Sequence, residues 1–163
     1  MKRSIRQRLM LIAGALVLVG LAGWQWRDDR MTDPGTLLSL DPTTIHRIDL
    51  ELPGVPAEHY TKRDGHWQAS DGASGPADDG RLTELAATAT AAVLSWRPAS
   101  DFDPAKIGLA PPAAVLTLDG QRLEFGETSV TGPQRYVRAG DRIALISVRY
   151  TPRPAPANAA KVR

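Results

Sequence analysis

Residues Ala113–Phe125 read AAVLTLDGQRLEF and carry the clearest strand signal in the chain. The dipeptide Asp119-Gly120 supplies the positive φ angles that a two-residue type I′ hairpin loop requires. The register that follows sets Leu116 opposite Leu123 and gives the hairpin one apolar face. The sequence therefore predicts two antiparallel strands that bury one side.

Two further hairpins are predicted by the same reasoning. One joins His59–Arg63 to His66–Gln68 through Asp64-Gly65, and its register places Tyr60 and Trp67 together on one face. The opposite face is wholly polar and holds His59, Thr61, Arg63, His66 and Gln68. The other hairpin joins Arg135–Arg138 to Ile143–Val148 through Gly140-Asp141.

The pattern outside the hairpins predicts one more strand and one helix. From Ile45, apolar and polar residues alternate as in a half-buried strand, which ends at Pro53-Gly54. Asp78 and Asp79 can cap a helix, and an apolar stripe at helical spacing then reaches Trp96, before Arg97-Pro98 stops it. The stripe comprises Leu82, Leu85, Ala86, Ala89, Val93 and Trp96.

These elements predict an α+β fold, in which an N-terminal transmembrane helix precedes an antiparallel β-meander of hairpins with one amphipathic helix. We expect a basic cytoplasmic tail at 1–8, a transmembrane anchor at 9–26 and a linker at 27–44. The α+β domain spans 45–150. The Pro/Ala-rich residues 151–163 are expected to form a disordered tail.

The membrane anchor is predicted from the length of an apolar run and from the residues that flank it. Leu9–Gly23 contains only apolar residues and glycine, and eighteen helical residues from Leu9 to Trp26 rise about 27 Å, close to the thickness of a bilayer core. Trp24 and Trp26 suit the membrane interface. A cleaved signal peptide is the competing interpretation, but Leu21-Ala22-Gly23 makes a poor cleavage site.

The charge distribution supports a membrane location and argues against nucleic-acid binding. The net charge of +2 depends on Lys2, Arg3, Arg6 and Arg8; without these four, 16 basic residues face 18 acidic ones. The basic character therefore belongs to a short tail rather than to a phosphate-binding face. The positive-inside rule keeps this tail cytoplasmic and places the domain in the periplasm of a bacterium, on a single-pass inner-membrane protein.

The search for catalytic chemistry yields no candidate. The chain has no cysteine, which excludes disulfides and thiolate chemistry, and it has no known nucleophile or phosphate-loop motif. His59 and His66 stand about 13 Å apart along the predicted strands, too far for one zinc ion. His46 is expected at the edge of the core on the apolar face of its strand. We predict no catalytic, cofactor-binding or metal-binding residues.

Several short motifs resemble a known family. Ile107-Gly108-Leu109-Ala110-Pro111-Pro112 leads into the first hairpin, which ends in Leu123-Glu124-Phe125-Gly126, and Tyr136-Val137-Arg138 follows. Asp64-Gly65-His66-Trp67 lies upstream. This order resembles the bacterial domain-of-unknown-function family 4340 (DUF4340), which is often membrane-anchored. The resemblance spans roughly Ile45 to Val148. It implies structural roles, and no catalytic ones, for Trp67, Gly108, Leu109, Pro111, Pro112, Gly126 and Tyr136.

The sequence leads to three functional hypotheses. The first is a non-enzymatic accessory or scaffolding protein of an envelope complex, in which the anchor raises the effective concentration of the domain for a membrane-protein partner. The second is a binding module for envelope glycan or lipid, with a possible binding face on Arg135, Arg138, Arg142 and Arg149. The third is a hydrolase with an unrecognised site, which requires a histidine and a carboxylate to converge in a pocket.

Overall fold

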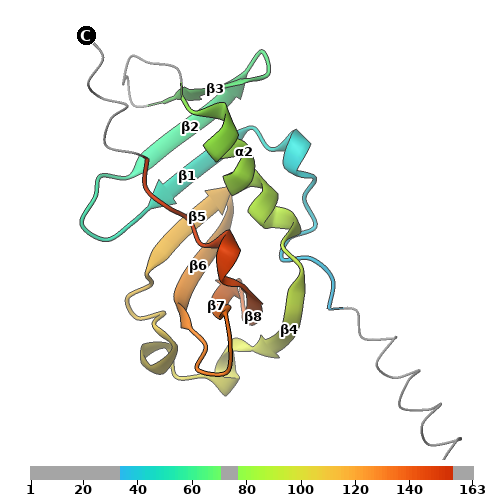
Figure 1. Ribbon diagram of the computed structural model, residues 1–163, viewed down its shortest axis with the longest axis vertical. Coiled ribbons are helices and arrows are strands. Elements are labelled where there is room, and N and C mark those ends of the chain that lie inside the picture. Colours follow the sequence, from blue (N-terminus) through green and yellow to red (C-terminus); the bar gives the residue numbers. More distant parts are fainter. Residues whose placement is uncertain (1–33, 71–76, 156–163) are drawn as a thin grey trace, which may run out of the picture. The chain divides into compact units, whose positions relative to one another are not determined.

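The computed structural model describes residues 34–70 and 77–155, which form an α+β fold (Figure 1). Within these ranges eight strands make one antiparallel sheet, in the order β3-β2-β1-β5-β6-β7-β8-β4. The predicted fold class of an antiparallel sheet with one helix is confirmed. The strands are β1 (Arg47–Glu51), β2 (Glu58–Arg63), β3 (His66–Ala69), β4 (Val93–Pro98), β5 (Ala114–Leu118), β6 (Gln121–Thr128), β7 (Gln134–Ala139) and β8 (Arg142–Ser147).

The three predicted hairpins form, and the two for which a register was predicted have that register. Lys62 pairs with Trp67 across the β2–β3 hairpin, and Leu116 pairs with Leu123 across β5–β6. Asp64 and Asp119 adopt positive φ angles of 50° and 46°, as a type I′ turn demands. Apolar residues are thereby directed to one side of the sheet.

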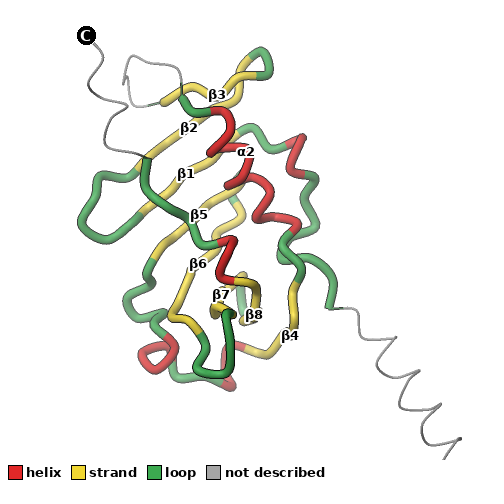
Figure 2. The backbone as a smooth tube through the Cα atoms, viewed as in Figure 1, coloured by secondary structure: helices red, strands yellow, loops and turns green. Residues whose placement is uncertain are grey.

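The helix is shorter than the apolar stripe predicted. Helix α2 (Asp79–Ala87) starts after Asp78, whose side chain accepts a hydrogen bond from the Arg81 N–H at 3.1 Å. After a 3₁₀ turn, η2 (Thr88–Thr90), the chain continues as β4 (Figure 2). The expected helical positions of Val93 and Trp96 are therefore wrong. The two residues also fit the spacing of a strand. Pairing with β8 satisfies backbone N–H and C=O groups of β8 that would stay unpaired at the sheet edge if the helix were longer.

One face of the sheet carries the main core. Helix α2 lies across this face and connects β3, at one edge of the sheet, to β4 at the other (Figure 1). Leu82 is fully buried beneath it, together with Ile48, Leu116 and Phe125 from the strands. This packing removes several large apolar side chains from water, the main source of folding free energy.

The residues expected to form the end of a linker belong to the fold. Leu37 N–H donates to Ala91 O at 3.0 Å, and Val93 N–H donates to Gly35 O at 3.0 Å, so this segment pairs with the residues at the start of β4. Leu37 and Leu38 are both buried in the main core. The predicted domain start at residue 45 is corrected to Pro34, the first described residue, because a segment without periodicity can still bury two leucines.

The second face of the sheet is covered over one half only. The connector between β4 and β5 contains the 3₁₀ turns η3 (Ala99–Asp101) and η4 (Pro104–Ile107), and it packs Ile107 and Leu109 onto Ile143 of β8. Phe102 meets Tyr136 of β7 edge-on, with ring centroids 5.8 Å apart. This small cluster leaves the β1–β3 half of the same face open.

The chain crosses back over the fold after β8. The 3₁₀ turn η5 (Val148–Tyr150) leads into residues 151–155, which were expected to lie in a disordered tail. Pro152 is buried, and the Ala155 N–H donates to Glu58 Oε1 at 3.1 Å. These five residues, here called the C-terminal strap, belong to the fold because the partly buried carboxylate of Glu58 holds the strap against β2.

The predicted anchor at 9–26 and the basic tail at 1–8 lie outside the described residues. Among residues 34–70 and 77–155, no helix has the length and apolar character needed to cross a bilayer. The remainder of the predicted tail, 156–163, also lies outside them.

Candidate functional site

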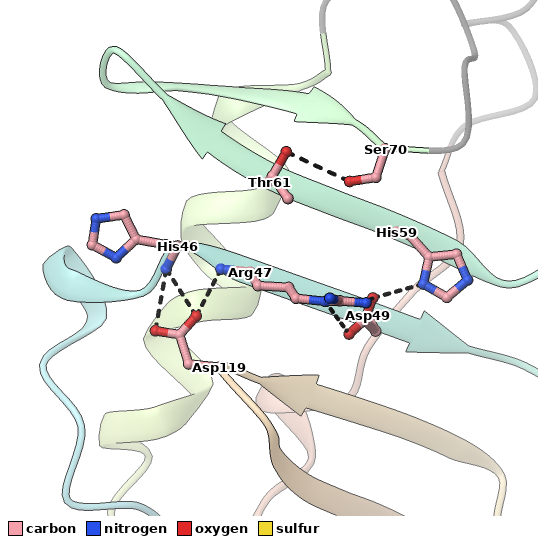
Figure 3. A network of polar contacts seen from close by, with 7 residues as sticks. All are labelled: His46, Arg47, Asp49, His59, Thr61, Ser70 and Asp119. Carbon is pink, nitrogen blue, oxygen red and sulfur yellow. Dashed lines mark hydrogen bonds and ion pairs between the residues drawn. The ribbon is translucent and has the colours of Figure 1, made fainter.

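The open half of the second sheet face is polar and forms the candidate site (Figure 3). Alternation along the strands turns one set of side chains away from the core, because neighbouring residues of a strand point to opposite faces. Strand pairing then sets Asp49 beside His59, and Arg47 beside Thr61. We call this set the polar sheet face: Arg47, Asp49, His59, Thr61, Arg63, Gln68 and Ser70.

Asp49 is the hub of one group of charges on this face. Its carboxylate lies 2.9 Å from Arg47 Nε and 2.6 Å from His59 Nδ1. Partial burial acts to raise the pKa of Asp49, but the hydrogen bonds from Arg47 and His59 outweigh it and hold the pKa below its ordinary value. An ionised carboxylate only accepts, so His59 carries a proton on Nδ1.

A groove of about 410 Å³ lies beside this hub. Its lining contributes the Thr61 and Ser70 hydroxyls, the Gln68 amide and the Arg47 and Arg63 guanidinium groups. Ser70 Oγ lies 3.5 Å from Thr61 Oγ1. Arg63 is exposed and has no acidic partner within the described part of the chain. The groove therefore offers several hydrogen-bond donors and one cation to a polar partner.

The hub has part of the geometry that a hydrolase needs. Asp49 orients His59 as the acid of a triad orients its base. Ser70 directly follows β3, and its N–H donates to His59 O at 2.8 Å, but its hydroxyl contacts Thr61. Neither Asp49 nor His59 lines the groove. The chemistry supported on this face is hydrogen bonding and ion pairing with a ligand.

The remaining histidines lie elsewhere. His46 is exposed, so its expected place on the apolar face is wrong: Ile45 is the buried residue, and the strand alternation begins only at Arg47. The His46 and Arg47 N–H groups both donate to the Asp119 carboxylate, at 3.0 and 2.7 Å (Figure 3). This contact fixes the β5–β6 turn against the start of β1.

His66 and His59 bind different carboxylates. His66 Nδ1 lies 2.7 Å from Asp79 Oδ2 at the start of α2, and the other oxygen of Asp79 accepts the Trp67 N–H at 2.7 Å. These hydrogen bonds lower the pKa of Asp79. Within the described ranges, no group of three or more histidine and acidic side chains is arranged to hold a metal ion.

The structure does not bring together the four arginines of the predicted binding face. Arg135 and Arg142 project to the core side of their hairpin, near opposite ends, whereas Arg138 projects to the other side. Arg135 Nη1 donates to Gly126 O at 2.8 Å, and Arg138 Nη1 lies 3.8 Å from Glu124. Arg149 stacks on Tyr150 within η5, at 4.6 Å from the ring centroid.

The family-like motif positions mainly support packing. Trp67 and Leu109 are buried, and Tyr136 packs in the small cluster of the second face. A Cβ on Gly108 would stand 2.8 Å from Glu127 N, and one on Gly126 would overlap Ile107 O. Pro112 forms a bridge with Leu109 and precedes β5, while Pro111 is exposed. These residues bring the connector close to β6.

Sequence reasoning found half of the polar sheet face. The hairpin register predicts that His59, Thr61, Arg63 and Gln68 share a face, but the alternation from Ile45 does not by itself place Arg47 and Asp49 beside them. Their alternation was the available signal, and the pairing of β1 with β2 was the missing fact. Ser70 begins a loop rich in Gly and Ser after the predicted strand, and no sequence pattern indicates that it approaches Thr61.

Comparisons with protein-family models, with curated proteins and with solved structures each found no match to this chain.

Proposed function

We propose that this chain is a single-span, membrane-anchored accessory or scaffolding protein of a bacterial envelope complex. Residues 9–26 would anchor it in the inner membrane with the N-terminus cytoplasmic, and the α+β domain would lie in the periplasm. The polar sheet face would bind a membrane-protein partner. No catalytic step is assigned to it.

The observation that carries the proposal is the uneven covering of the second sheet face. The connector covers β6–β8 with Ile107 and Leu109, but nothing in the described chain covers the β1–β3 half. Side chains there form a donor-rich groove, and Arg63 offers an unpaired charge. Such a surface suits a polar protein interface, because the polar groups of a docked partner can form hydrogen bonds or ion pairs with it.

The short path from the predicted anchor supports a role at the membrane. Only Arg27–Asp33 separates the predicted span from Pro34, which is already part of the fold. Seven residues reach at most about 25 Å. The domain would therefore stay near the bilayer, where its effective concentration for a membrane partner is high.

The test is site-specific crosslinking in cells. A photo-crosslinking residue replaces Thr61 on the polar sheet face of the tagged full-length chain, and a matched probe replaces Val130, which is fully exposed beyond the end of β6. We expect the Thr61 probe to capture one envelope membrane protein that the Val130 probe does not. We also expect Arg63→Glu to reduce that capture. Failure of the Thr61 probe to form a specific adduct, with a lone monomer recovered from gently solubilised membranes, would contradict the proposal.

The donor-rich groove also favours a second candidate, an envelope-glycan binding module. Hydroxyl, amide and guanidinium groups are the partners that acidic sugars require. This function predicts binding of an anionic glycan fragment to the full-length chain, weakened by salt and by Arg63→Gln. Absence of binding at low salt would exclude it, and a titration calorimeter provides the measurement.

A further inference from the structure

A second groove lies where the chain enters the domain. It has a volume of about 940 Å³ and is lined by Pro34–Ser39 on one side and by Trp96 and Arg142 on the other. Gln121, the first residue of β6, and Gly140, in the turn between β7 and β8, complete the rim. We call it the proximal groove, because the first described residue forms part of its wall.

One aromatic residue ties this groove to the incoming chain. Trp96 Nε1 donates to Pro34 O at 2.9 Å, and the Arg142 guanidinium stacks over the Trp96 ring, 4.2 Å from its centroid. Stacking orients the guanidinium and leaves its N–H edge available for an anion. Arg142 is exposed and has no acidic partner within the described ranges.

The residues that line this groove and a smaller one beside it carry a net positive charge. A smaller neighbouring groove shares Arg122 and Gly140 with it and adds Arg138 and Glu124. Glu124 lies 3.0 Å from Arg122 and 3.8 Å from Arg138. The two grooves thus carry three guanidinium groups against one carboxylate. The exposed Asp141, in the turn beside them, offsets part of this charge.

We propose that the proximal groove binds the phosphate headgroups of anionic phospholipids. This inference rests on the proposed membrane anchorage, since Arg27–Asp33 can place Pro34 no further than about 25 Å from the end of the span. Guanidinium groups bind phosphate oxygens through paired hydrogen bonds, and a tryptophan beside them suits the interface. Headgroup binding would fix the orientation of the domain at the bilayer and leave the polar sheet face for a partner.

The test uses the absence of native cysteine. Single cysteines are introduced in the full-length chain at Gln121, on the groove rim, and at Val130, at the far end of the sheet, and each carries a nitroxide label. The proteins are placed in nanodiscs of phosphatidylcholine alone or with about 30% phosphatidylglycerol. Electron paramagnetic resonance then measures collision of each label with a water-soluble nickel chelate.

We expect phosphatidylglycerol to lower the nickel accessibility of the Gln121 label about twofold and to leave the Val130 label unchanged. Arg142→Gln should abolish the difference. Arg149→Gln is the matched control, since Arg149 is also exposed and stacked on an aromatic ring, but lies at the other end of β8. Arg142→Lys keeps the charge without the planar stack and should retain part of the effect.

Two outcomes would overturn the inference: a Gln121 label equally accessible in both nanodiscs, or a lipid effect that survives Arg142→Gln. Extraction of the same proteins from membranes with alkaline carbonate tests the membrane anchor independently of the headgroup site. A chain that resists extraction but shows no lipid effect retains the proposed anchor and loses the headgroup site. A chain released by carbonate contradicts the anchor itself.

Discussion

At the scale of single residues, two glycines allow the connector to approach the sheet. Gly108 has φ +69°, in the left-handed region that favours glycine, and it faces the backbone of Glu127. Gly126 faces Ile107 O across the same contact. The short motif that resembles a family pattern therefore has a physical reason: any side chain at these positions would push η4 away from β6.

Gly108→Ala should lower the free energy of unfolding by about 2 kcal/mol or more, since it combines a strained φ with a steric overlap. Gly132→Ala is the matched control, because its Cβ would have no atom nearer than 3.8 Å. Urea titration of the full-length chain in detergent, followed by circular dichroism, measures both variants. Equal stability of the two would refute this explanation of Gly108.

Residue-level prediction from sequence worked where chemistry is local. The φ preference of Asp-Gly predicts two hairpin registers, and Asp78, one of the two candidate caps, caps α2 in the structure. It failed for His46, whose place depends on Asp119, 73 positions along the chain. A contact of this kind leaves no periodic signal in the sequence.

At the scale of elements, the C-terminal strap and helix α2 are joined to β2 through one carboxylate. Glu58 accepts hydrogen bonds from Arg81 Nη2 at 2.7 Å, from Tyr60 OH at 2.8 Å and from the Ala155 N–H at 3.1 Å. Burial acts to raise the pKa of Glu58, but these donors together hold it below its ordinary value. Three segments far apart in sequence thus meet at one partly buried charge.

Glu58→Gln should destabilise the fold by about 2 kcal/mol at neutral pH, because Arg81 would keep a poorly solvated charge without its partner. A depressed carboxylate pKa stabilises the fold above the unfolded value of about 4.3, and this contribution is lost as the pH falls through the folded pKa. The difference in stability between the wild type and Glu58→Gln should therefore disappear at acidic pH. Glu84→Gln, exposed on the same helix, is the control.

Thermal melts from pH 7 down to about pH 3 provide the measurement. If the difference in stability between wild type and variant stayed constant over this pH range, the charge of Glu58 would contribute nothing to stability.

Element types were predicted better than element ends. Val93 and Trp96 satisfy both a helical stripe and a strand, so spacing alone could not decide between them. The strand prevailed because β8 supplies five paired residues along it. The polar sheet face shows the same limit, since its two halves became one surface only when β1 paired with β2.

At the scale of the whole molecule, the fold incorporates residues that the sequence pattern assigned to a linker. Leu37 is 3% exposed, and its N–H donates a hydrogen bond to Ala91 O, just before β4. The core of the described fold therefore includes residues that precede β1.

Leu37→Ala should cost about 2–4 kcal/mol, the range for a buried leucine. Leu94→Ala, at a position 55% exposed in the adjacent strand, should cost less than about 1 kcal/mol. Chemical denaturation of the full-length chain in detergent compares them. If the two variants were equally stable, the segment at 34–38 would not be part of the cooperative unit.

The pairing of Gly35 and Leu37 also bears on how copies of the chain can associate. Within the described residues, this segment pairs with Ala91–Val93 at the start of β4, so that part of the sheet edge is shielded from strand addition. The other edge is β3, four residues long and paired only with β2. Two copies joined through β3 would consume both β3 edges, so assembly by this route would stop at a closed pair instead of growing into a fibre.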